Sequence, residues 1–460
     1  MHHHKVKIVA TLGPSTGSEE SIAALIGAGV NLFRLNFSYG SHDSHADTIR
    51  TVRRVAAREG RLVGILQDIC GPKIRIRGLG KRITVERGER LKLAKKADEE
   101  AFSITYPELV DSLKIGEKLF FADGTVETEV VGKEERAVTL EVLTPGALAE
   151  GKGVNLPEST LPLRALTPKD RDDLVFGARM GVDFVAISFV NDEKDIEEAR
   201  SIVREAGSDA WIVAKIERKS ALAHIDAIIE ASDAVMVARG DLGAEAGLFR
   251  VPMLQKEIIA RCNRLAKPVI TATQMLTSMI ASPYPTRAEV SDIANAVLDG
   301  TDAVMLSDET AVGRYPVKAV EVLVDTICQT QESYPYFASF TPRPREAFAH
   351  AASELSRSLA CDFAAALTRS GFTLRHLSRF RPKKPIYAIT TTPSLPGKTT
   401  LIWGVKECVV VEGFANEKEL VERFLARAGI DPDAFILVTG YLGEKISQGR
   451  SVRYIDYRKS

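Results

Sequence analysis

Eight short apolar runs recur along the chain up to residue 308, and they constrain the fold more than any other feature of the sequence. Amphipathic stretches with helical periodicity separate most of them. Eight strands that alternate with helices are the number that closes a parallel barrel, so the sequence predicts an α/β fold built on a (β/α)8 TIM barrel. The runs are KIVAT (7–11), LFRLNF (32–37), GILQDI (64–69), FVAISF (184–189), WIVAKI (211–216), AVMVAR (234–239), VITATQ (269–274) and AVMLSD (303–308).

Residues that start and stop helices support this alternation. Ser18 precedes two glutamates and an apolar stretch that ends at Gly29, and Thr167 precedes Pro168 in a stretch that ends at Gly181. Ser and Thr accept hydrogen bonds from the free amides at a helix start, Pro suits the first helical position, and Gly terminates helices. We therefore expect helices within residues 18–29 and 167–181.

The alternation breaks once, after the third run. Residues 70–156 contain alternating segments separated by Gly and Asp-Gly turns and no comparable helix, which is typical of a small antiparallel β domain. Beyond Tyr334, a segment rich in Pro and aromatic residues indicates a linker before a final α/β domain. The expected division is a barrel at 1–69 and 157–333, an inserted β domain at 70–156, and a C-terminal α/β domain at 334–460.

Composition narrows the function classes. Lys+Arg and Asp+Glu balance at 61 each, which argues against nucleic acid as a partner because proteins that bind it carry a basic excess. No apolar run approaches the roughly 20 residues of a membrane span, and the N-terminus has no signal-peptide core, so we expect a cytoplasmic protein without membrane contact. The five cysteines include no C-x-x-C pair and predict neither disulfides nor a zinc site.

Polar residues at the strand ends mark the expected active site, because barrels of this type carry their sites at the C-terminal ends of the strands. Glu217 and Asp241 follow neighbouring strands and offer hard oxygen ligands without His or Cys beside them, a set that suits Mg²⁺ or Mn²⁺. Alternatively, each carboxylate only pairs with a nearby cation such as Arg218 or Arg239. The other polar strand-end residues are Arg34, Asn36, Ser38, Asp68, Lys215, Thr271, Thr273 and Ser307.

The predicted site has more positive charge than two carboxylates need. A metal with excess cations suits phosphate, and phosphoryl transfer requires mainly positioning and charge stabilisation; a solvated network of ion pairs is the alternative. A P-loop does not supply this chemistry, because the PGKTT segment (396–400) follows Thr392 where a glycine is required, and we expect an ordinary loop there. The basic residues are Arg34, Lys73, Arg75, Lys169 and Lys215.

Several longer segments carry a family resemblance. They include KIVATLGPST, FRLNFSYGSH, GPKIR, LTPKDRDDL, MVARGDLGAE, KPVITATQML and the whole run from Pro285 to Pro316, which is the most specific. In this order, and over nearly the whole chain, they resemble the pyruvate kinase family. The resemblance implies that the inserted domain is a mobile lid and the C-terminal domain is regulatory. It also implies transfer of a phosphoryl group from phosphoenolpyruvate to ADP with Mg²⁺, giving ATP and pyruvate in glycolysis.

The resemblance implies residue roles around the transferred phosphoryl group. Lys215 would stabilise its charge, Glu217 and Asp241 would hold the metal, and Arg34 would hold the substrate together with the backbone at Gly240 and Asp241.

It implies further roles for proton transfer and for the nucleotide. The enolate would receive its proton near Thr273, with Ser307 and ordered water, since a hydroxyl alone is a poor acid. Tyr39 stands where the family usually has histidine, and Asp308 where it has glycine. The residues expected at the nucleotide are Asn36, Tyr39, Arg75 and Lys169.

Lys73 leads to a prediction about monovalent cations. In much of the family this position is glutamate, beside a bound K⁺ held by oxygens that match Asn36, Ser38, Asp68 and the backbone of Ile69. An ammonium group can supply the same charge as the ion. We therefore expect Lys73, anchored by Asp68, to make K⁺ unnecessary.

The LTRSGFT segment resembles the family's phosphate-holding effector loop. Thr368, Ser370 and Thr373 offer hydroxyls around Arg369, and Gly371 lets the backbone approach an anion. A simple turn after a strand is the alternative. The resemblance also implies a phosphorylated allosteric effector and a homotetramer.

Two other functions stay open from the sequence. One is another Mg²⁺-dependent barrel enzyme that acts on phosphoenolpyruvate or an enolate, such as an aldolase or a mutase. The other is a metabolite sensor on a catalytic fold that has lost its activity.

Overall fold

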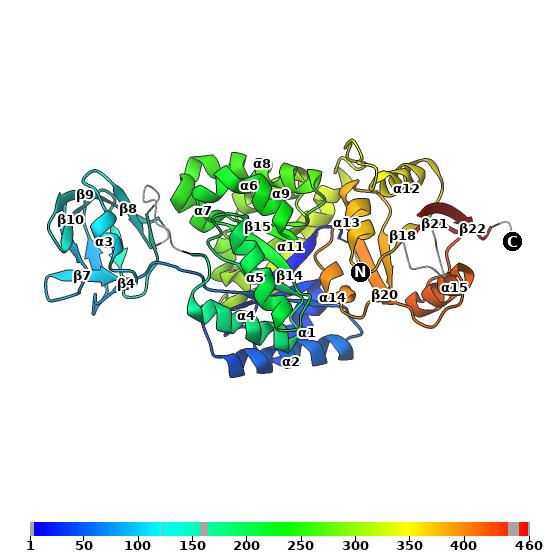
Figure 1. Cartoon of the computed structure of the whole chain (residues 1–460), viewed down its shortest axis with the longest axis horizontal. Helices are drawn as coiled ribbons and strands as arrows, with labels where there is room; N and C mark the ends of the chain where they lie inside the picture. Colours follow the sequence, from blue (N-terminus) through cyan, green and yellow to red (C-terminus); the bar gives the residue numbers. More distant parts are fainter. Residues whose placement is uncertain (1–3, 123, 157–163, 440–449, 459–460) are drawn as a thin grey trace.

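Three units lie along one axis in the computed structural model, which describes residues 4–122, 124–156, 164–439 and 450–458. The barrel lies in the centre, the inserted β domain at one end and the C-terminal domain at the other (Figure 1). The predicted boundary between the inserted domain and the barrel falls between residues 156 and 157, and residue 157 lies outside the described residues.

The central unit is a closed parallel barrel of eight strands in the order β1-β17-β16-β15-β14-β13-β3-β2, as the sequence predicts. Six of the predicted runs end one or two residues early, because the residues after each strand already turn into the mouth of the barrel. The strands are β1 (Lys7–Thr11), β2 (Leu32–Asn36), β3 (Gly64–Asp68), β13 (Phe184–Ile187), β14 (Trp211–Ile216), β15 (Ala234–Ala238), β16 (Val269–Ala272) and β17 (Ala303–Leu306).

Helices surround the barrel, and both predicted helix boundaries are confirmed. The Ser18 side chain accepts from the Ser21 amide at the start of the first helix, and Gly29 ends it. Thr167 caps α4, and Gly181 ends it in the left-handed conformation. The main helices are α1 (Glu19–Ala28), α2 (His42–Arg58), α4 (Pro168–Met180), α5 (Glu193–Glu205), α6 (Ile225–Ala231), α7 (Arg239–Ala246), α8 (Val251–Arg264), α9 (Arg287–Asp299), α10 (Asp308–Ala311) and α11 (Pro316–Glu332).

The inserted domain is a β structure with its own apolar core, which includes Phe102, Phe121 and Leu140. Seven strands form a sheet in the order β12-β8-β9-β10-β6-β7-β4, and β11 pairs with β5. The expectation of a purely antiparallel domain is wrong at one place, because β6 and β7 pair in parallel. The strands are β4 (Ile76–Arg77), β5 (Ile83–Val85), β6 (Arg90–Ala94), β7 (Ala101–Ile104), β8 (Lys118–Phe121), β9 (Val126–Lys133), β10 (Ala137–Val142), β11 (Gly146–Leu148) and β12 (Val154–Asn155).

The C-terminal domain is a five-stranded sheet in the order β20-β19-β18-β21-β22 with helices against it. The last strand, β22, pairs antiparallel with β21 in an otherwise parallel sheet. The PGKTT segment is a short helix and not the loop we expected. The elements are α12 (Ala347–Ser358), β18 (Phe363–Leu367), α13 (Phe372–Arg379), β19 (Ile386–Thr390), α14 (Leu395–Thr399), β20 (Val405–Val410), α15 (Glu417–Ala428), β21 (Ala434–Thr439) and β22 (Ser451–Asp456).

The barrel and the C-terminal domain share polar contacts at their boundary. The Lys7 ammonium at the start of β1 donates to the Val405 carbonyl, and Arg381 forms a buried ion pair of 2.8 Å with Asp302. Among the described helices, none is both long and apolar enough to cross a membrane.

Candidate active site

A cavity of about 530 Å³ lies where the strand ends of the barrel face the inserted domain. Residues 150–153 of the inserted domain form part of its wall, so the lid and the barrel enclose the same space. Most of the predicted site residues line it. They are Arg34, Asn36, Ser38, Tyr39, Asp68, Ile69, Lys73, Arg75, Lys215, Glu217 and Asp241.

Lys215 is the centre of the charged cluster in this cavity. Its ammonium lies 2.9 Å from Glu217 and 3.0 Å from Asp68, and it donates to the Ser188 hydroxyl at 2.7 Å. Only 10% of the side chain is exposed. A strand that places Lys215 and Glu217 two residues apart directs both to the same side, and the structure confirms that they converge.

Arg34 is fixed beside this cluster. Its Nε donates to Asp68 at 2.6 Å, and its terminal nitrogen donates to the Thr11 hydroxyl at 3.1 Å. Asp68 is thus buried between two cations, and its role in the structure is to hold both of them at the floor of the cavity.

The electrostatics of the cluster favour the charged form of the lysine. Burial opposes charge on Lys215, but Asp68 and Glu217 outweigh it and raise the pKa of Lys215. Burial would also raise the pKa of Asp68, yet Lys215 and Arg34 lower that pKa below its ordinary value. Burial raises the pKa of Glu217 against the opposing charge of Lys215, and nearby Asp241 adds to the rise.

Lys73 contacts a different carboxylate from the one we expected. Its ammonium lies 3.0 Å from Asp241, whereas the oxygens of Asp68 are taken by Arg34 and Lys215. The expectation that Asp68 anchors Lys73 is therefore corrected. Asp241 lies in the first turn of α7, because helix geometry starts directly after β15.

The residues expected at the nucleotide are only partly brought together. Tyr39 is 69% exposed at the rim of the cavity, and the Arg75 guanidinium donates to the Gly151 carbonyl of the lid at 3.0 Å. Lys169 does not line the cavity; it donates to the Phe37 carbonyl at 3.0 Å and pairs with Asp173 at 2.5 Å within α4.

The residues expected near the enolate lie beside the cavity and do not line it. The Gly240 amide donates to the Thr273 hydroxyl at 2.9 Å, and that hydroxyl donates to the Ala272 carbonyl at 2.6 Å. Thr273 has a φ of 68°, a strained value for a β-branched residue. The Ser307 amide donates to Glu309 at 2.7 Å.

Sequence reasoning missed Ser188, which directly follows β13. Its hydroxyl donates to the Ile69 carbonyl at 2.6 Å while it accepts from Lys215. The amide of Phe189, the next residue, donates to Glu217 at 2.7 Å. The signal was present, because Ser188 is a polar residue at a strand end, like those that the sequence analysis named on six of the other strands; Thr11, at the end of β1, was missed in the same way.

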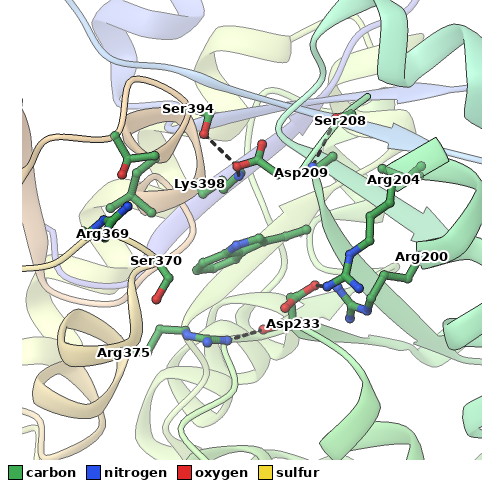
Figure 2. A pocket seen from close by; sticks show the side chains of 15 residues that line it. Arg200, Arg204, Ser208, Asp209, Asp233, Arg369, Ser370, Arg375, Ser394 and Lys398 are labelled. Carbon is green, nitrogen blue, oxygen red and sulfur yellow. Dashed lines mark hydrogen bonds and ion pairs between the residues drawn. The ribbon is translucent and has the colours of Figure 1, made fainter. Parts of the chain in front are cut away.

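The residues of the predicted effector loop do not all face the same space. The Thr368 hydroxyl is buried and accepts from the Gly371 amide at 3.0 Å, which closes the turn from inside. Arg369 and Ser370 are exposed and line a second cavity, against the barrel (Figure 2). Thr368 and Thr373 are not part of that lining.

Glu217 and Asp241 fit a hard divalent cation. Both are carboxylates whose charges are close enough to raise the pKa of Glu217, and both are currently neutralised by lysines. Within the described part of the chain, no group of three or more His, Cys, Asp or Glu side chains could hold a metal. Mg²⁺ commonly binds one or two carboxylates and takes its other oxygens from water and substrate phosphate. The closed barrel, the lid, two carboxylates that could hold a divalent metal and the surplus cations are together typical of a phosphoryl-transfer enzyme of the β/α-barrel class.

Comparisons with known proteins identify the family. The model of the pyruvate kinase barrel domain matches residues 3–320, and that of the pyruvate kinase alpha/beta domain matches residues 346–445. The chain is 44% identical to pyruvate kinase 2 of Synechocystis sp. over 89% of its length and 71% of the relative. It is 42% identical to a pyruvate kinase of Geobacillus stearothermophilus (87% and 71%) and 40% identical to one of Agrobacterium vitis (95% of each).

The chain belongs to the pyruvate kinase family. Its activity is that of a pyruvate kinase, the glycolytic transfer of a phosphoryl group from phosphoenolpyruvate to ADP with a divalent metal. The pyruvate kinase activity expected from the sequence is confirmed. The comparisons give no support to the alternatives, an aldolase, a mutase or an inactive sensor.

Proposed function

We propose that Lys215 is the residue that stabilises charge on the phosphoryl group during its transfer. The observation that carries this assignment is the buried contact of its ammonium with Asp68, Glu217 and Ser188 at the floor of the cavity. Because these partners fix the ammonium before substrate arrives, little reorganisation is needed when charge develops on the phosphoryl oxygens. Because the carboxylates raise its pKa, the lysine keeps its charge at neutral pH.

Arg34 is proposed to bind the substrate from the same floor. Its guanidinium is held by Asp68 and Thr11, so its remaining donors face the cavity with little freedom. The backbone at Gly240 and Asp241 opens α7, and amides at a helix start favour an anionic group; the Gly240 amide, which now donates to the Thr273 hydroxyl, would have to turn to the substrate. Two fixed cations and these amides would orient phosphoenolpyruvate for in-line transfer.

Glu217 and Asp241 are proposed to hold the divalent metal. When bound, the metal neutralises phosphate oxygens of donor and acceptor. In the structure Glu217 pairs with Lys215 and Asp241 pairs with Lys73. Both ion pairs would have to open before the carboxylates could bind a metal. The attraction of these two carboxylates also explains why Lys215 and Lys73 both face the catalytic cavity.

Thr273 and Ser307 are proposed to lie along the route by which a proton reaches the enolate. The Thr273 hydroxyl is fixed by the backbone, because it accepts from the Gly240 amide and donates to the Ala272 carbonyl. A hydroxyl with an ordinary, high pKa is a poor acid, so we propose that it orders a water instead of donating its own proton.

Asn36, Tyr39, Arg75 and Lys169 are proposed to meet the nucleotide. Arg75 supports this role best, because its bond to the Gly151 carbonyl fixes it against the turn between β11 and β12 that borders the cavity. Closure of the lid would exclude water from the reacting groups and strengthen the field of the cations. Lys169 would have to leave Asp173 to reach a phosphate.

The metal assignment is tested by Mn²⁺ binding measured by electron paramagnetic resonance. We expect Glu217→Gln to weaken binding by about tenfold or more. Glu197→Gln, which removes an exposed carboxylate from α5, serves as the matched control and should bind Mn²⁺ as the wild type does. Equal affinity in the Glu217→Gln variant would reject the assignment, whatever the activity of that variant.

Lys73 is proposed to replace a monovalent cation. What supports this is its position in the same cavity wall as Asn36, Ser38, Asp68 and Ile69, and the internal use of those oxygens: Asn36 accepts from the Ser38 amide, and Ile69 accepts from Ser188. In Lys73→Glu, a carboxylate beside Asp241 would need a cation between them. We expect that variant to acquire K⁺ activation, and a K⁺ response unchanged from wild type would count against this role.

A phosphorylated effector and a homotetramer are also proposed. The loop that contains Thr368, Arg369, Ser370, Gly371 and Thr373 supports the first, since the exposed Arg369 and Ser370 and a glycine lie at the start of α13, while the buried Thr368 hydroxyl holds the turn. Exposed apolar side chains at Leu248, Phe249 and Met253 support an interface between copies. Light scattering coupled to gel filtration would reject the tetramer by giving a single-chain mass.

A further inference from the structure

The turn that follows β16 has a strained backbone. Thr273 and Gln274 have φ values of 68° and 57°, and in the described part of the chain they are the one pair of consecutive non-glycine residues with positive φ. Thr273 is β-branched, and β-branched residues rarely adopt this conformation. Such strain persists only where the surrounding structure over-determines the backbone, so neighbouring groups must hold this turn.

Arg239 is the side chain that holds it. Arg239 is the first residue of α7, and its side chain is 9% exposed. Its Nε donates to the Thr273 carbonyl at 3.2 Å, and a terminal nitrogen donates to the same carbonyl at 2.7 Å. Because a guanidinium is planar and rigid, two of its donors on one oxygen fix the peptide group that follows Thr273.

The other terminal nitrogen of Arg239 is fixed from two helices. It lies 2.7 Å from an oxygen of Asp292 in α9 and 3.3 Å from the side-chain oxygen of Gln255 in α8. Gln255 is itself buried, and its amide donates to Asp299 at 3.1 Å. All three nitrogens of the guanidinium therefore have acceptors, and the side chain cannot turn without breaking its ion pair with Asp292.

This arrangement determines where the Thr273 hydroxyl lies. The hydroxyl accepts from the amide of Gly240, the residue after Arg239, at 2.9 Å. The start of α7 thus contacts Thr273 twice, at its hydroxyl and at its carbonyl. Because the Gly240 amide would have to turn to the substrate, the two bonds from Arg239 to the carbonyl are the contacts that would keep Thr273 in place during the reaction.

We propose that Arg239, held by Asp292, is a positioning residue for protonation of the enolate, because it keeps Thr273 in the conformation that places its hydroxyl on the proton route. This inference rests on the proposed role of Thr273. In that step the methylene carbon of the enolate takes a proton from the water ordered at the hydroxyl and a C–H bond forms. The hydroxide left behind then takes a proton from solvent. Arg239 does not line the catalytic cavity and acts only through Thr273.

Incorporation of deuterium into the methyl group of pyruvate measures the proton step by itself. A site that protonates the enolate also removes a proton from bound pyruvate in the reverse direction. The exchange is followed by NMR in D2O, with Mg²⁺ and with inorganic phosphate in place of the transferred group. Arg239→Lys keeps the charge and loses the planar pair of donors, so exchange should fall about tenfold or more. A folded Arg239→Lys variant that exchanges at the wild-type rate would overturn the proposal.

Asp292→Asn tests the same role without changing a buried side chain. Asp292 is 34% exposed, and asparagine still accepts a hydrogen bond, so the variant should fold and lose about threefold in exchange. It decides the question if Arg239→Lys does not fold. Arg261→Lys is the matched control, since Arg261 pairs with Asp226 at 2.8 Å outside the catalytic cavity. Wild-type exchange in Asp292→Asn, or an equal loss in Arg261→Lys, would contradict the proposal.

Mn²⁺ binding separates this role from general support of the site. The helix that begins at Arg239 also carries Asp241, so a merely structural role would weaken Mn²⁺ binding and exchange together. We expect Arg239→Lys to bind Mn²⁺ as the wild type does while its exchange falls. A parallel loss of both would show that Arg239 supports the helix and not the proton step, and the proposal would be wrong.

A double variant tests whether Arg239 acts through Thr273. Thr273→Val removes the hydroxyl and should lower exchange by itself, and adding Arg239→Lys should then lower it no further, because the two residues act in one step. A further loss of about tenfold in the double variant would overturn the inference and leave the proposed role of Thr273 standing. Wild-type exchange in Thr273→Val would instead reject the role of Thr273, and the inference with it.

Discussion

Replacement of Lys215 by methionine removes the charge on which phosphoryl transfer is proposed to depend, while nearly conserving the volume of a buried side chain. Two unit charges about 4 Å apart interact by about 4 kcal/mol at an effective dielectric constant of about 20. Because each 1.4 kcal/mol of barrier is a factor of about ten in rate, turnover should fall by about a thousandfold. Lys215 is 10% exposed, so solvent screening does not reduce this figure much.

The same change leaves Asp68 and Glu217 with fewer cations, and breaking a buried pair destabilises a protein by about 3–5 kcal/mol. Circular dichroism must therefore show that the variant is folded before its rate is interpreted. The assay is ATP formation from phosphoenolpyruvate and ADP. Lys194→Met, which replaces an exposed lysine of α5, is the control, and Mn²⁺ binding by the Lys215→Met variant should persist. A folded Lys215→Met variant whose turnover lies within tenfold of the wild type would refute the reasoning.

Three further predictions concern stability and positioning. Burial lowers the pKa of Lys7 to about 7, so the unfolded chain binds more protons above that pH. The contribution of Lys7 to the free energy of unfolding should then rise with pH from about 7 to about 10, by up to about 1.4 kcal/mol per pH unit. Lys7→Met should remove this part of the slope in urea titrations and leave the part that comes from Lys5 and Lys267, whose pKa values are lowered to about 8; an unchanged slope would contradict it. Ser188→Ala should lower kcat/KM about tenfold by freeing Lys215 from one bond of about 1.4 kcal/mol, and a wild-type value would show that the bond is dispensable. Gly371→Ala should cost about 1–2 kcal/mol of stability from backbone strain alone, measured by denaturant unfolding; no loss would mean that the turn relaxes.

The strands and helix ends were predictable because local rules decide them. Each barrel strand is buried on both sides, so it appears as an unbroken apolar run, and runs such as residues 211–216 match the structure residue for residue. Ser18 and Thr167 cap their helices through contacts within three residues. The convergence of Lys215 and Glu217 followed from strand alternation in the same way.

What the sequence did not predict depends on contacts between distant segments. The Lys73 to Asp241 pair joins residues 168 positions apart, and no periodicity selects Asp241 over Asp68 as its partner. The parallel β6–β7 pair is likewise a choice of tertiary packing. The role of Ser188 likewise depends on partners that are distant in the sequence, Lys215 and Ile69, which its hydroxyl joins.

The most direct test of the account is ATP synthesis by the purified wild-type chain from phosphoenolpyruvate, ADP and Mg²⁺, in buffers free of K⁺ and then with added KCl at constant ionic strength. If Lys73 supplies the positive charge in the cavity, ATP should form at full rate without K⁺, and added K⁺ should leave the rate unchanged. Rates that depend strongly on K⁺ would contradict the role of Lys73, and absence of ATP under both conditions would contradict the catalytic assignment itself.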